Sequence, residues 1–194
     1  MDVSLTLPFP ADWRAQVLTG PPLIAPARQF IYPRAVPGEE DALARGAMYV
    51  LVKPSSGGEF LATCARGFAD PALPSGIWSC PRPQEICLVS GGYACMVDTL
   101  APEQAALVPQ RPVTEVVPAV EAGLLLFAGF HTVIAWGANG LAWETGKLTW
   151  EGLTLGAVDG NVLNGMGWDM MADKEVPFEV DLSTGKHTGG GFRG

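Results

Sequence analysis

The chain has 194 residues and a formal charge of −8, and 48% of its residues are hydrophobic against 16% charged. This composition excludes intrinsic disorder, and the excess of 20 acidic over 12 basic residues excludes a function based on nucleic-acid phosphates. With 24 glycines and 17 prolines, the chain is typical of short strands joined by turns, so we expect one antiparallel all-β domain over residues 1–194 with little helix.

The first part of the chain, residues 1–84, is mostly irregular. Strands are expected over residues 3–7 and 29–32, and one short helix over 39–45, with Gly46 at its C-cap position. Apolar runs on both sides of the turn sequence Ser-Ser-Gly-Gly predict a hairpin over 47–66.

Residues 85–190 contain three segments with a common pattern. Each of 85–99, 123–136 and 162–182 has an apolar strand, a glycine and a second apolar strand. Two of them contain Val-Asp, as Val97-Asp98 and Val180-Asp181, and the latter continues as Leu-Ser-Thr-Gly-Lys. Residues 85–190 therefore resemble the blade repeats of PQQ- and WD-type β-propellers, which implies repeat-like sheets arranged as propeller-like blades.

A β-sandwich is the alternative architecture, because four propeller blades need about 160–180 residues and three repeats are visible. The whole chain also looks like a member of an uncharacterised bacterial family, and this resemblance implies no activity.

The sequence Asn139-Gly140 is the strongest hairpin signal of the chain. If these two residues form the loop, both adopt positive φ, and Trp136 lies directly opposite Trp143 on one face of the sheet. Asp159-Gly160 predicts a second turn of the same kind.

The cysteines at positions 64, 80, 87 and 95 lack the Cys-x-x-Cys spacing of zinc sites. We expect four reduced, buried thiols, with a redox pair of Cys80 and Cys87 as the alternative, and neither a metal nor a cofactor. The N-terminus lacks a signal-peptide pattern, and the longest apolar stretch, 123–130, is too short to span a bilayer. These features predict a cytoplasmic protein that does not insert into membranes.

Catalytic candidates are few. A two-carboxylate hydrolase needs one carboxyl group in an apolar pocket and a second one that stays ionised. Asp169, between Trp168 and Met170, fits the first role, and Glu144 is a candidate for the second. His131 at the start of an apolar strand is a candidate general base, although a structural role is the simpler interpretation.

Aromatic residues could line a concave binding site, although in a strand-rich protein they more often form the core. The candidates are Tyr93, Trp136, Trp143, Trp150 and Trp168. The sequence thus predicts a non-catalytic cytosolic binding or protein-interaction module, with a small carboxylate-based hydrolase as the alternative. Its expected partner is a second copy of itself or another protein, because open strand edges need cover.

Overall fold

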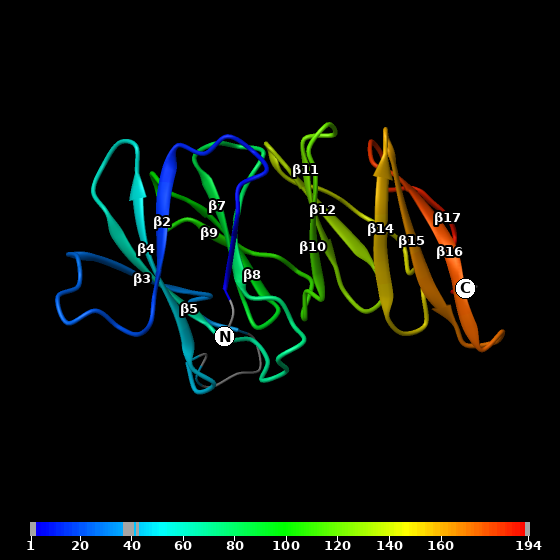
Figure 1. Ribbon diagram of the computed structural model, residues 1–194, viewed down its shortest axis with the longest axis horizontal. Coiled ribbons are helices and arrows are strands. Elements are labelled where there is room, and N and C mark those ends of the chain that lie inside the picture. Colours follow the sequence, from blue (N-terminus) through cyan, green and yellow to red (C-terminus); the bar gives the residue numbers. More distant parts are fainter. Residues whose placement is uncertain (1–2, 37–40, 42, 193–194) are drawn as a thin grey trace. The chain divides into compact units, whose positions relative to one another are not determined.

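The computed structural model describes residues 3–36, 41 and 43–192. These residues form no helix, and their strands make four sheets (Figure 1), which confirms the predicted all-β class. Most strand pairs are antiparallel, and β1–β6 and β3–β5 are parallel. By its internal contacts the chain divides into two compact units, residues 1–112 and 113–194. The single domain expected from the sequence stays a prediction.

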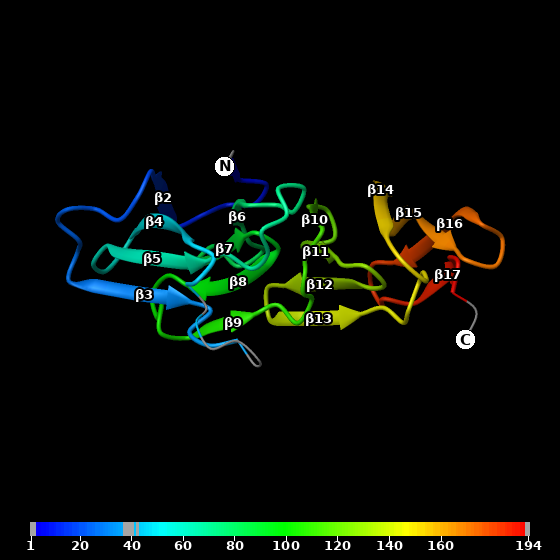
Figure 2. The same cartoon turned by 90° about the horizontal axis from the view of Figure 1, so that it is seen from below.

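The first unit is built from two sheets. One has the order β1-β6-β7-β8-β9, and the other has the order β2-β4-β5-β3 (Figure 2). The strand bounds are β1 Ser4–Thr6, β2 Trp13–Leu18, β3 Arg28–Tyr32, β4 Ala47–Pro54, β5 Phe60–Ala65, β6 Gly76–Ser79, β7 Glu85–Ser90, β8 Tyr93–Asp98 and β9 Ala105–Leu107.

Apolar side chains from both sheets form the core of the first unit. Val50, Val52 and Phe60 of one sheet pack with Ile86 and Leu88 of the other, and all five are almost fully buried. The two layers are also joined by hydrogen bonds, since the Trp13 indole N–H donates to the Glu85 carbonyl at 3.0 Å. The first unit is therefore a two-layer sandwich.

The second unit consists of two four-stranded sheets that follow one another along the chain. The first has the order β10-β11-β12-β13 and the second the order β14-β15-β16-β17. The bounds are β10 Glu115–Ala119, β11 Leu124–Ala128, β12 Val133–Gly137, β13 Gly140–Glu144, β14 Leu153–Asp159, β15 Val162–Asp169, β16 Lys174–Asp181 and β17 His187–Gly189. Leu126 and Ala135 of the first sheet pack with Leu163, Phe178 and Val180 of the second to form the core.

Several predicted elements are confirmed. The strands expected at 3–7 and 29–32 are β1 and β3, the hairpin over 47–66 is β4–β5, and the three repeated segments are the hairpins β7–β8, β11–β12 and β15–β16. The irregular first part of the chain also holds β2 and β6, which the sequence did not predict. Of the expected helix, residues 39, 40 and 42 lie outside the described residues, and 43–45 form a turn.

The predicted register of the β12–β13 hairpin is wrong. Gly137 pairs with Gly140, Gly140 has φ 97°, and Asn139 is not among the described residues with positive φ. Two residues, Ala138 and Asn139, lie between this pair, so the loop closes one residue earlier than predicted. A β-bulge at Ala142, opposite Ala135 and Trp136, then shifts the register by one residue. Trp143 consequently pairs with Ala135, and the two tryptophans lie on opposite faces of the sheet. The Asp159-Gly160 turn lies one residue later than predicted, because Asp159 pairs with Val162.

Gly165 of β15 lies directly against an aromatic ring of the neighbouring strand in the second sheet of unit 2. It pairs with Phe178 of β16, and a Cβ atom added to it would lie 2.2 Å from the Phe178 ring. The ring therefore occupies the space over the glycine on the inner face of the sheet, which is a recurrent way to compensate for a glycine inside a strand.

We predict that Gly165→Ala destabilises the chain by about 1–3 kcal/mol, because the added methyl group displaces the Phe178 ring from the core. Gly137→Ala is the matched control, since Gly137 is also a strand glycine of unit 2 and its added Cβ would meet nothing closer than Leu124 at 3.4 Å. Urea unfolding followed by tryptophan fluorescence measures both. Equal stability of the two variants would contradict the packing described.

Candidate functional site

The two carboxylate candidates, Asp169 and Glu144, lie in different sheets, and each accepts hydrogen bonds from residues close to it. Asp169 ends β15 and is buried, and its Oδ1 accepts the backbone N–H groups of Met171 at 2.9 Å and Ala172 at 3.1 Å. Glu144 ends β13 and is exposed, and its Oε1 accepts the hydroxyl of Thr132 at 3.2 Å. The Asp169 carboxylate thus holds the loop between β15 and β16, a capping role for which short acidic side chains are well suited.

His131 lies in the turn between β11 and β12 and is exposed. Its carbonyl accepts the N–H of Leu148 at 2.8 Å, and its ring stands edge-on to Phe130 with centroids 6.5 Å apart.

The five aromatic candidates are distributed over both units. Tyr93 is buried in the first unit against Phe68, and Trp136 is buried in the sheet β10–β13. Trp143 is half-buried and joins the two sheets of the second unit, because its indole N–H donates to the Leu182 carbonyl at 2.7 Å.

The two remaining tryptophans differ in their exposure to solvent. Trp150 is half-buried and contacts Phe192, with ring centroids 4.9 Å apart, and the Lys147 ammonium lies 5.0 Å from the Trp150 ring. Trp168 of β15 is exposed to 36%. It is therefore the candidate tryptophan most available to a partner.

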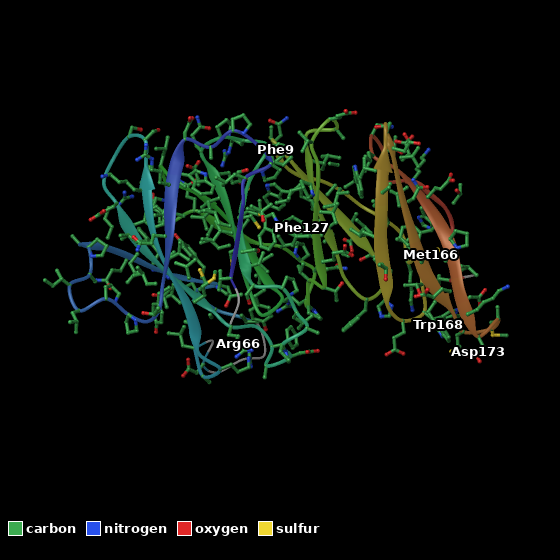
Figure 3. All side chains as sticks on the ribbon, in the orientation of Figure 1. Phe9, Arg66, Phe127, Met166, Trp168 and Asp173 are labelled. Atoms are coloured by element: carbon green, nitrogen blue, oxygen red, sulfur yellow. The ribbon has the colours of Figure 1, made fainter. Side chains whose placement is uncertain are left out.

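The outer face of the sheet β14–β17 carries large apolar side chains that point away from the core of unit 2. Residues 163, 165, 167 and 169 of β15 are buried, and residues 166 and 168 between them are exposed. On this face Met166 is exposed to 37% and Trp168 to 36%, and in the turn that follows β15 Met170 is exposed to 54% and Met171 to 81%. We call these four residues the Met–Trp surface. Figure 3 shows Met166 and Trp168 one after the other along β15, with Asp173 at the end of the hairpin.

An acidic row lies beside the Met–Trp surface on the same face of the sheet. Met166 pairs with Pro177 and Trp168 pairs with Glu175. Because side chains alternate along a strand, Glu175, Pro177, Glu179 and Asp181 share one face of β16, and all four are exposed. The face thus presents an apolar row on β15 next to a row of carboxylates on β16.

Asp181 has a second role at the end of this row. Its Oδ1 accepts the N–H of Ser183 at 2.8 Å and that of Thr184 at 3.1 Å, and hydrogen bonds from the Ser183 side chain and backbone and from Thr184 hold the pKa of Asp181 below its usual range. Asp181 therefore stays ionised while it holds the turn between β16 and β17.

A cleft of about 560 Å³ lies in the first unit between β3 and β9, the end strands of the two sheets. Its floor belongs to the core: Tyr32 is buried, its hydroxyl donates to the Pro102 carbonyl at 2.5 Å, and Phe30 stacks on it with centroids 6.3 Å apart. Arg34 and Glu103 at the rim are exposed and of opposite charge. The cleft is the open end of the sandwich.

The four cysteines are free and buried. Burial raises the pKa of Cys64, Cys80 and Cys87, and it raises the pKa of Cys95 to about 12. In the described part of the chain, no three histidine, cysteine or acidic residues are grouped so that they could hold a metal ion. Among the same residues there is no helix long and apolar enough to cross a membrane.

The chain matches no protein-family model, and no curated protein is significantly similar to it. The assignment of a function therefore rests on the surfaces described above.

We predict that the four thiols of the folded chain react with a disulfide reagent at pH 8 at least about a hundredfold more slowly than in guanidinium chloride, because raised pKa values and burial keep them protonated and inaccessible. Ser55→Cys supplies the control, since Ser55 is exposed and its replacement should react at once. Rapid labelling of a native thiol in the unmodified chain would show that one of these cysteines is reactive.

Proposed function

We propose that the chain is a protein-interaction module that binds a segment of another protein through the Met–Trp surface, and that it acts by binding rather than by catalysis. The observation that carries this proposal is the exposure of four large apolar side chains within residues 166–171, from 36% at Trp168 to 81% at Met171. Clustered exposed apolar residues of this kind mark interaction sites in soluble proteins.

The chemistry of the side chains suits a binding surface. Tryptophan is enriched among the residues that contribute most to binding free energy, because its ring buries a large area and loses little conformational entropy. Methionine is unbranched and polarizable, so it adapts to partners of different shape. Met170 and Met171 next to Trp168 thus combine one rigid contact with two adaptable ones.

The surface is held in place before any partner binds. β15 is paired on both sides, with β14 and with β16. The Phe178 ring over Gly165 fixes the inner face, and the Asp169 carboxylate fixes the loop that carries Met170 and Met171. A preorganised surface loses less entropy on binding, which favours affinity.

The hydrolase alternative receives less support, because the Asp169 carboxylate already accepts two backbone N–H groups of its own loop. A cytoplasmic location is part of the proposal. It is supported by the four free cysteines, since thiols persist in reducing compartments.

The test is a peptide selection from a random display library on the unmodified chain, with affinities of the selected peptides measured by calorimetry. We expect micromolar peptides that lose about tenfold in affinity on the variant Met170→Gln/Met171→Gln, which corresponds to about 1.4 kcal/mol. Both residues lie in an exposed loop, so the variant should keep the fold, which circular dichroism checks.

Leu141→Gln is the matched control, because Leu141 is an equally apolar side chain of unit 2 that is exposed to 51% on another sheet. Selected peptides that bind both variants as tightly as the unmodified chain would refute the proposed surface, and so would a selection that enriches no binding peptide.

A further inference from the structure

We infer that the segment bound by the Met–Trp surface is a basic amphipathic helix, with one apolar stripe bordered by lysine or arginine. This inference rests on the proposed function and names the class of partner. Three features of unit 2 support it: the two rows of side chains on β15 and β16, the net negative charge and the backbone pairing of β15.

The two rows lie side by side with opposite character. On β15 the outward positions are Val162, Asn164, Met166 and Trp168, and on β16 they are Glu175, Pro177, Glu179 and Asp181. Neighbouring strands are about 4.8 Å apart. When an apolar side chain of the partner lies on Trp168, the partner residues next to it are therefore within reach of Glu175. None of these eight positions is basic.

The net negative charge of the second unit also favours a basic partner. Residues 113–194 contain ten acidic and four basic residues, which gives −6 of the formal charge of −8 of the whole chain. A partner with positive side chains beside its apolar stripe is therefore attracted from a distance as well as held at the surface.

The backbone of β15 determines that the partner segment is helical. Apart from the irregularity in β14 between Leu155 and Val158, the backbone of β15 pairs with β14 on one side and with β16 on the other. The face of the sheet therefore offers mainly side chains to a partner. An extended segment laid on this face would bury unpaired amides, whereas a helix satisfies its own backbone. The row from residue 175 to 181 is about 20 Å long at 3.4 Å per residue, which matches a helix of about 14 residues.

The same features disfavour two other occupants. A second copy of the chain in this position would place two rows of carboxylates against each other, which is repulsive. An anionic lipid surface or a nucleic acid would meet the same negative charge.

The experiment compares two synthetic 14-residue helical peptides with identical leucine stripes, one bordered by lysine and the other by glutamate. Calorimetry with the full chain should show binding of the leucine–lysine peptide at least about tenfold tighter than that of the leucine–glutamate peptide, with a difference that shrinks as salt screens the charges. Equal affinities, or tighter binding of the leucine–glutamate peptide, would overturn the inference.

Two charge variants test whether the acidic row causes this difference in affinity. Glu175→Gln/Glu179→Gln should lower the affinity for the leucine–lysine peptide about fivefold and reduce the salt dependence of its binding. Glu121→Gln/Glu144→Gln, which removes the same charge from exposed positions of unit 2 outside the sheet β14–β17, should leave the affinity within about twofold, because only screened long-range attraction is lost. If the two variants weaken binding equally, the acidic row is not the recognition element.

The Met170→Gln/Met171→Gln variant separates failure of this inference from failure of the proposed function. If the leucine–glutamate peptide binds as well as the leucine–lysine peptide and both lose affinity on this variant, the surface binds partners and the inferred charge preference is wrong. If this variant changes the affinity of neither synthetic peptide, and does not change the affinities of the library peptides either, the proposed function fails. A dimer seen by light scattering and abolished by this variant would identify a second copy as the occupant.

Discussion

The contact between the Phe178 ring and Gly165 fixes which side of β15 belongs to the core. Because the ring fills the space over the glycine, Leu163, Phe178 and Val180 pack together against the sheet β10–β13. Side chains alternate between the two faces of a strand. Once Gly165 faces the core, the face of each remaining residue of β15 is therefore fixed. Met166 and Trp168 consequently point outward together with the carboxylates of β16.

The same two-residue period explains how much of the fold could be predicted from the sequence. The hairpins 47–66 and β11–β12 were predictable, because apolar runs and turn glycines mark them locally. β2 and β6 were not, because β2 pairs with the distant β4, β6 pairs with the distant β1 as well as with the following β7, and both lie close to prolines. The sequence marks the Asn139-Gly140 turn, but the loop closes one residue earlier, and a β-bulge places Trp143 opposite Ala135, on the other face from Trp136.

The candidate site was only partly accessible to sequence reasoning. The sequence identifies Trp168 as a binding candidate, but it does not identify Met166, Met170 or Met171. The sequence predicts Asp169 to be a carboxyl group in an apolar pocket formed by its neighbours, yet Trp168 and Met170 are exposed on either side of it. The missing information was the direction of each side chain, and the alternation of glycine with large residues over 165–168 is the signal that could have supplied it. The row of carboxylates required the register of β16, which no local pattern contains.

The Met–Trp surface is exposed to solvent, and methionine oxidation tests this most directly. Exposed thioethers are oxidised by hydrogen peroxide much faster than buried ones. Mass spectrometry of peptides from the folded chain should show Met171 and Met170 oxidised first and Met166 next, with Met48 and Met96, which are exposed to 4% and 1%, protected. Protection of Met166 and Met170 to the same degree as Met48 would show that this face is covered and would contradict the account.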